Sequence, residues 1–110
     1  MGETVGHDHP VLVRTMCPTP ESARDLASTV VHAKLASAAH VSERKSFYWW
    51  EEVLNERAEW ELICVTRSDR FAEISRVINA EHPYELPELI MIPISETSDA
   101  YNEWIKKYTG

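Results

Sequence analysis

Four aromatic residues follow one another at positions 47–50 (Phe-Tyr-Trp-Trp), and no other feature constrains the fold as strongly. Aromatic side chains favour strands, and successive side chains of a strand point to opposite faces of the sheet. Residues 60–66 repeat this two-sided apolar pattern. If helices cover one face only, the other face exposes more apolar surface than a monomer usually tolerates. The pattern therefore predicts a sheet that self-associates through its open face.

Strand and helix signals alternate along the rest of the chain. Short apolar or β-branched runs indicate strands, and apolar residues three and four apart indicate helices behind the capping candidates Thr19 and Ser68. The predicted elements are strands at 11–16, 47–50, 60–66 and 89–94 and helices at about 20–35, 68–82 and 98–108. This order predicts an α+β fold with a ferredoxin-like β-α-β-β-α-β sheet, helices on one face and an additional C-terminal helix.

Two segments are less clearly defined by the sequence. Residues 36–41 are ambiguous between strand and helix end. Residues 51–59 contain neither Gly nor Pro. Because two-residue hairpin turns favour Gly, we expect a longer arm between the strands at 47–50 and 60–66 instead of a tight turn.

Length and charge limit the organisation and the partners. A chain of 110 residues is enough for one domain, and we expect a flexible leader over residues 1–10 and a single domain over residues 11–110. Eighteen acidic and eleven basic residues give a formal net charge of −7, and the basic residues are scattered along the chain. Nucleic acids and anionic membranes repel such a chain, so neither is expected as a partner.

The leader and the cysteines indicate the compartment. Residues 1–10 are polar and lack the basic start and apolar stretch of a secretion signal, and no run approaches the roughly 20 apolar residues of a membrane span. Cys17 and Cys64 follow no metal or redox spacing, which fits a reducing compartment where a buried cysteine acts as a small hydrophobe. We therefore expect a cytoplasmic protein without a disulfide.

An ordered set of motifs extends over most of the chain. Its most specific part, residues 82–90, reads His-Pro-Tyr-Glu-Leu-Pro-Glu-Leu-Ile, and the other parts are Ala23-x-x-Leu26-Ala27, Lys34-Leu35-Ala36, Phe47-Tyr48-Trp49-Trp50-Glu51, Glu59, Pro93-Ile94 and Tyr101-x-x-Trp104-Ile105. This set resembles the CutA divalent-ion-tolerance family from Val11 to Trp104. The resemblance implies a ferredoxin-like subunit in a homotrimer, an architecture related to PII-type signalling proteins, and a link to copper or another divalent metal.

Several positions depart from the pattern of this family. A cysteine implicated in metal binding is replaced by Ala38, and His40 is new. The family's Pro-Gly turn is replaced by residues 42–45 (Ser-Glu-Arg-Lys), a Gly by Glu52, and a Lys by Val65. These changes bear on the metal function more than on the fold.

The candidate metal ligands are His82, Glu59, His40 and Cys17. Imidazole and carboxylate groups bind copper and zinc, so His82, Glu59 and His40 are candidates for a modified site across a subunit boundary. Each also has a structural alternative: His82 bonds carbonyls at a helix end, His40 lies at the surface, and Cys17 is buried and inert. In the leader, His7-Asp8-His9 predicts only weak, adventitious metal binding.

Aromatic residues and one carboxylate are candidates for the subunit interface and its clefts. Ligand pockets are mostly apolar with a few placed polar groups. Buried aromatic residues also serve as core, and this alternative stays open for most of them. The candidates are Tyr48, Trp49, Trp50, Trp60, Tyr84, Glu88 and Trp104.

Two functions from different classes follow from the sequence. The first is a non-enzymatic homotrimer that binds a copper-type divalent metal or a small ligand at inter-subunit clefts and contributes to metal tolerance. The second is a scaffold reused as an enzyme or pathway protein that acts on a small molecule, because His40 beside carboxylates can perform acid-base chemistry. The sequence contains no known catalytic motif, and regulation by nucleotide lacks a visible phosphate-binding loop.

Overall fold

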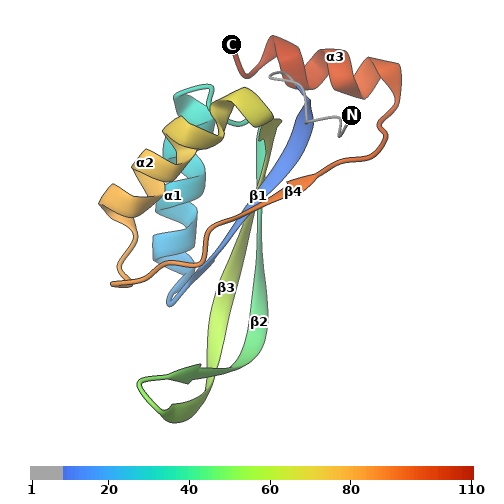
Figure 1. The fold of residues 1–110 in the computed structure, drawn as a ribbon. Coiled ribbons are helices and arrows are strands. Elements are labelled where there is room, and N and C mark those ends of the chain that lie inside the picture. Colours follow the sequence, from blue (N-terminus) through green and yellow to red (C-terminus); the bar gives the residue numbers. More distant parts are fainter. Residues whose placement is uncertain (1–8) are drawn as a thin grey trace.

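A four-stranded sheet carries two helices on one face and a third helix at one end (Figure 1). The computed structural model describes residues 9–110, so His7 and Asp8 of the predicted leader lie outside the described residues. The elements in chain order are β1 (Pro10–Cys17), α1 (Pro20–His32), β2 (Ala38–Trp50), β3 (Val53–Arg67), the 3-10 helix η1 (Ser68–Arg70), α2 (Phe71–Glu81), β4 (Ile90–Pro93) and α3 (Asp99–Lys107). This order confirms the predicted α+β fold and its C-terminal helix.

The sheet is antiparallel throughout, with the strand order β2-β3-β1-β4. All eight residues of β1 pair with β3, and β4 pairs with the other edge of β1. β2 pairs with β3 along its whole length from Ala38 to Trp50, so the ambiguous stretch at 36–41 contributes the start of β2. The first and third strands lie at the centre, as expected for a ferredoxin-like sheet.

Local sequence signals set both ends of α1. Thr19 accepts a hydrogen bond from the backbone N–H of Ser22 at 3.0 Å, Ser22 completes a capping box, and Pro20 occupies the first turn. The helix ends at His32 instead of continuing to residue 35, and Lys34 then adopts a left-handed backbone with a φ of +58°. Its buried residues are Ala23, Leu26 and Val30. None of the helices within residues 9–110 is long and apolar enough to cross a membrane.

The core lies between the sheet and helices α1 and α2. The register places Val11 and Val13 of β1 opposite Thr66 and Cys64 of β3, so the side chains of all four point to the helix-covered face. The buried core residues are Val11, Val13, Cys17, Ala23, Leu26, Val30, Leu35, Ala36, Leu62, Cys64, Ile74 and Ile78. Both cysteines are buried here as free thiols.

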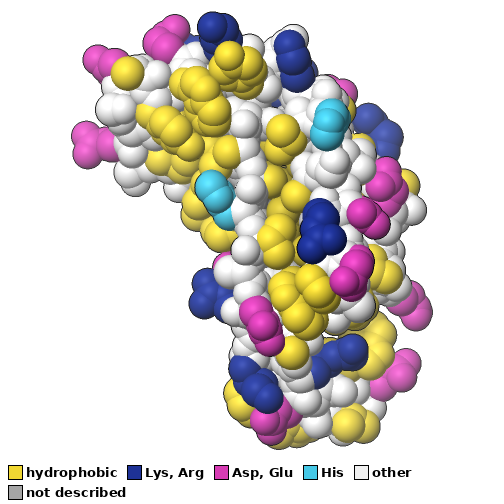
Figure 2. All heavy atoms as spheres, turned by 180° about the vertical axis from the view of Figure 1, so that it is seen from behind, with side chains coloured by type: hydrophobic (Ala, Val, Ile, Leu, Met, Phe, Trp, Pro, Cys, Tyr) yellow, Lys and Arg dark blue, Asp and Glu magenta, His cyan; other side chains and the backbone are white. Residues whose placement is uncertain are grey.

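No described helix covers the opposite face of the sheet (Figure 1). Seen from behind, apolar side chains form an interrupted band from the α3 end of the molecule towards the β2–β3 hairpin (Figure 2). Large apolar side chains on both sides of the hairpin are strongly exposed: Val53 at 59% on the open face, and Phe47 at 64%, Trp49 at 71% and Leu54 at 58% on the other. An apolar surface of this extent is typical of an interaction site.

The β2–β3 hairpin closes through a two-residue turn at Glu51 and Glu52, so the prediction of a longer arm over residues 51–59 is wrong. Trp50 pairs directly with Val53, and the two turn residues have φ values of +50° and +66°. Tight hairpin turns with positive φ at both central residues usually contain Asn and Gly. The sequence does not predict this turn, because two glutamates occupy the positions where Asn and Gly are usual. Its backbone also suits the Gly that the resemblance to CutA implies at the position of Glu52.

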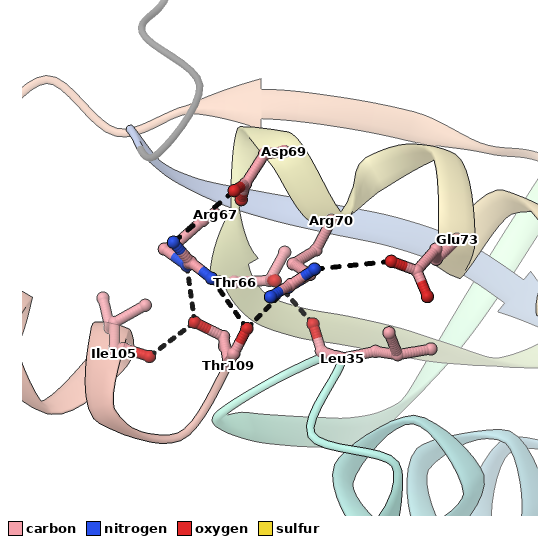
Figure 3. Close-up of polar contacts among 8 residues, drawn as sticks. All are labelled: Leu35, Thr66, Arg67, Asp69, Arg70, Glu73, Ile105 and Thr109. Carbon is pink, nitrogen blue, oxygen red and sulfur yellow. Dashed lines mark hydrogen bonds and ion pairs between the residues drawn. The ribbon is translucent and has the colours of Figure 1, made fainter.

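Helix α2 begins at Phe71, and its N-cap residue Arg70 makes no capping bond through its side chain. The prediction that Ser68 caps this helix is therefore wrong, because Ser68 starts the short 3-10 helix that precedes α2. This junction instead anchors the end of the chain (Figure 3). Arg67 donates to the Thr109 hydroxyl and carbonyl oxygens, both at 2.8 Å, and Arg70 donates to the same carbonyl at 2.5 Å.

Replacing the turn by Asn-Gly (Glu51→Asn with Glu52→Gly) should stabilise the hairpin, because these residues adopt a positive φ with less strain. We expect the free energy of unfolding to rise by about 1 kcal/mol, measured by denaturant unfolding. As a matched control, Glu43→Gly removes a glutamate from the interior of β2 and should lower stability. A less stable Asn-Gly variant would contradict the turn geometry.

Candidate functional site

A groove lies between the β2–β3 hairpin and the segment that links α2 to β4. Its volume is about 830 Å³, within the range of small-molecule sites. The register places the hairpin residues Tyr48, Arg57 and Glu59 on the open face, away from the helices. The lining residues are Arg14, Met16, Ser46, Phe47, Tyr48, Trp50, Arg57, Glu59 and residues 83–88.

A network of charges lies beside the groove on the open face. Glu61 is only 6% exposed, and its carboxylate oxygens lie 3.0 Å from Arg14 Nε and 2.9 Å from Arg44 Nη2. Arg14 Nε also lies 3.0 Å from Glu88 Oε2. A carboxylate that is this deeply buried needs such partners, because removal of an unpaired charge from water is costly.

Two tyrosines of the groove, Tyr84 and Tyr48, lie beside its charged groups. The Tyr84 hydroxyl donates to Glu59 Oε2 at 2.5 Å, and Glu59 is only 4% exposed. Burial, followed by this bond to the carboxylate, raises the pKa of Tyr84. The Arg57 guanidinium lies over the Tyr84 ring, 6.0 Å from its centroid, and a hydrogen bond with Tyr48 raises the pKa of Arg57. Tyr84 is therefore neutral and Arg57 is charged at neutral pH.

His82 is held at both ring nitrogens. Nε2 donates to the Met16 carbonyl at 2.7 Å, and Nδ1 accepts the backbone N–H of Tyr84 at 3.0 Å. The two bonds require a neutral ring with its proton on Nε2, and burial lowers the pKa of His82. Cys17 Sγ lies 3.9 Å from Nε2, and burial raises the pKa of the Cys17 thiol to about 11. The sulfur is thus protonated at neutral pH, whereas metals bind the thiolate.

The four predicted metal ligands do not converge within one chain. His82 and Cys17 lie together, and Glu59 is bonded to the tyrosine that follows His82 by two residues. His40 is exposed and lies four residues along β2 from the residue that pairs with Glu59, a separation of roughly 13 Å at strand spacing. Residues 9–110 contain no group of three or more His, Cys, Asp or Glu side chains arranged to hold a metal ion.

The predicted cleft residues separate into two groups. Four of them line the groove: Tyr48, Trp50, Tyr84 and Glu88. The other three lie elsewhere, because Trp49 points to the opposite side of the hairpin and Trp60 packs partly buried against the core. Trp104 lies on α3, with its ring centroid 5.3 Å from that of Tyr101 and 5.7 Å from that of Tyr108.

Arg57 and the Arg14–Glu61 ion pair belong to the site, and sequence reasoning missed them. Arg57 carried a signal, because it lies two residues from Glu59 and shares its strand face. The prediction of a longer arm over residues 51–59 leaves this signal unused, because a shared strand face requires a strand there. Arg14 and Glu61 are far apart in the sequence and come together only through the pairing of β1 with β3.

Residues 11–108 match the family model described as CutA1 divalent ion tolerance protein. The chain belongs to this family. The match extends over nearly all of the sheet and over all three helices. It confirms the resemblance that the ordered motifs of the sequence indicate.

Individual relatives agree with this membership. The divalent-cation tolerance protein CutA of Pyrococcus horikoshii is 32% identical over 99 residues, which cover 90% of this chain and 97% of the relative. The chloroplastic protein CutA of Arabidopsis thaliana is 34% identical over 100 residues, covering 90% of this chain and 55% of the relative. The solved structure of the periplasmic divalent cation tolerance protein CutA from Archaeoglobus fulgidus superimposes with a TM-score of 0.90 at 30% identity, covering 92% of this chain and 99% of that one.

Stability should depend on the protonation of His82. Folding lowers its pKa, so in mildly acidic solution the unfolded chain binds the proton more readily than the folded chain. The stabilisation that comes from the neutral His82 ring is fully present above pH 6.5, the ordinary pKa of histidine. It is lost as the pH falls from there through the lower pKa of the folded state. His82→Gln should therefore flatten the fall of the thermal midpoint between about pH 7 and pH 5.

His32→Gln is the matched control for this measurement. His32 is exposed at the end of α1, and among the described residues its Nδ1 hydrogen-bonds with Ser28 of its own helix. This variant should keep the pH dependence of the parent protein. An equally steep pH dependence in His82→Gln would show that the buried ring is not its source.

Proposed function

We propose that this protein is a cytoplasmic homotrimer that binds a divalent metal of the copper type, or a small ligand, in clefts between its subunits and contributes to metal tolerance. Membership of the divalent ion tolerance family supports the metal-tolerance role. The uncovered face of the sheet, with its exposed apolar side chains, is the observation that supports the assembly.

Assembly through the open face would remove several large apolar side chains from water. Ile90 is 41% exposed and Ile92 37%, and the register places both on this face. Each Å² of apolar surface buried contributes about 25 cal/mol. A second copy of the chain is a suitable partner, because a symmetric oligomer covers the same patch on every subunit.

A metal site on this protein needs ligands from more than one subunit. Within one chain His82 uses both ring nitrogens, Cys17 is a protonated thiol, and Glu59 accepts the Tyr84 hydroxyl, so these residues do not fit a metal by themselves. His40 differs because it is exposed on the open face, where a neighbouring subunit can add further ligands. We therefore place His40 at the subunit boundary as the principal metal ligand.

The groove supports a second candidate function, in which the family scaffold binds or converts a small molecule. The volume of about 830 Å³ suits such a ligand. In the resemblance to CutA, the cysteine implicated in metal binding is Ala38 in this chain, which weakens the metal alternative. The groove does not depend on that cysteine, because no cysteine is among its lining residues.

The cytoplasmic location stays a prediction from the composition of residues 1–10. Relatives carry names that refer to other compartments. The Arabidopsis protein is called chloroplastic, and the Archaeoglobus protein is called periplasmic.

A titration of the tag-free, metal-stripped full chain with Cu²⁺ and Zn²⁺ tests the metal-binding function. We expect one strong site per subunit, lost in His40→Ala and about tenfold weaker in His82→Ala, while the double variant His7→Ala/His9→Ala retains it. His32→Ala, which removes another exposed histidine, is the control and should bind like the parent protein. Absence of binding, or binding lost only in the His7/His9 variant, would rule out the metal site and favour the small-molecule candidate.

A further inference from the structure

Arg57 is an exposed cation whose guanidinium lies against an aromatic ring. It lines the groove from β3, and the Tyr84 ring lies beneath its guanidinium, with the centroid at 6.0 Å. The Tyr84 ring is itself fixed, because its hydroxyl donates to the buried Glu59 carboxylate at 2.5 Å. A guanidinium that is already oriented loses little conformational entropy when it binds a ligand.

The carboxylates of the groove are mostly engaged with other groups. Glu88 pairs with Arg14 at 3.0 Å, and Glu59 accepts the Tyr84 hydroxyl. Glu85 is exposed to solvent at the rim. Within residues 9–110, none of these carboxylates lies within ion-pair distance of Arg57, although the charge of Glu59 helps to raise the pKa of Arg57. Such a guanidinium is suited to a planar, bidentate oxyanion.

Aromatic side chains form the wall beside this cation. Trp50 is 40% exposed and lies on the same strand face as Tyr48 and the register partner of Arg57. Both aromatic side chains line the groove with the apolar Met16. A ligand with an oxyanion at one end and a flat apolar body would match the guanidinium and the rings together.

We propose that this groove binds a small organic oxyanion, either a carboxylate or a phosphate monoester, through the Arg57 guanidinium, with the apolar body of the ligand against Tyr48 and Trp50. The inference specifies the small ligand of the proposed function and rests on that function in one respect, since the groove must stay open in the assembled protein. It does not depend on metal binding.

Titration of the full chain with four probes, followed by ¹H–¹⁵N NMR, tests this inference. Benzoate and phenyl phosphate carry the oxyanion, benzyl alcohol is the neutral analogue, and benzylammonium is the cationic one. Both oxyanions should bind about tenfold more tightly than benzyl alcohol and should shift the indole N–H signal of Trp50. The stronger of the two identifies the preferred oxyanion, and either preference supports the inference.

Arg57→Gln should abolish the preference for oxyanions and leave the weak binding of benzyl alcohol unchanged. Arg24→Gln, which removes an exposed arginine from α1, is the matched control and should keep the preference. Equal binding of all probes, tightest binding of benzylammonium, or an unchanged preference in Arg57→Gln would overturn the inference. If the oligomeric mass of each variant equals that of the parent protein, such a result leaves the proposed assembly and metal site intact.

Discussion

Strand alternation in the long β2–β3 hairpin determines which side chains meet the helices and which face away from them. In β3, Leu62 and Cys64 pack under α1 and α2, whereas Glu59 and Glu61 point to the open face. A shift of the register by one residue would exchange the two sets and place both carboxylates in the apolar core. The apolar core therefore fixes the position of every charged group on the other face.

The groove is a consequence of this fixed register. It holds Glu59 and Arg57 two residues apart on one strand face, and the segment after α2 brings Tyr84 to both of them. The same segment places His82 between the Met16 carbonyl and its own chain. His82 thus belongs to the structure that supports the groove. The Arg57 guanidinium and the rings of Tyr48 and Trp50 line the groove itself.

Sequence patterns predicted those elements whose signals are local. The capping box and apolar face of α1 are examples, since both depend on residues a few positions apart. The strand at 53–59 was missed, because the hairpin extends beyond the helices there and neither face needs to be apolar within one chain. The turn at Glu51 and Glu52 was missed because its backbone is unusual for glutamate. The role of His82 depends on Met16, a partner far away in the sequence, so no local pattern could indicate it.

The central claim is that the open sheet face is an interface between copies of this chain, and sedimentation equilibrium at micromolar concentration tests it most directly. We predict a mass three times that of the 12.6 kDa chain. Ile63→Lys, which places a charge on the open face, should dissociate the assembly while the circular dichroism of the fold is retained. Val31→Lys, on the exposed side of α1, should leave the mass unchanged. A parent chain that sediments as a 12.6 kDa monomer would contradict the account.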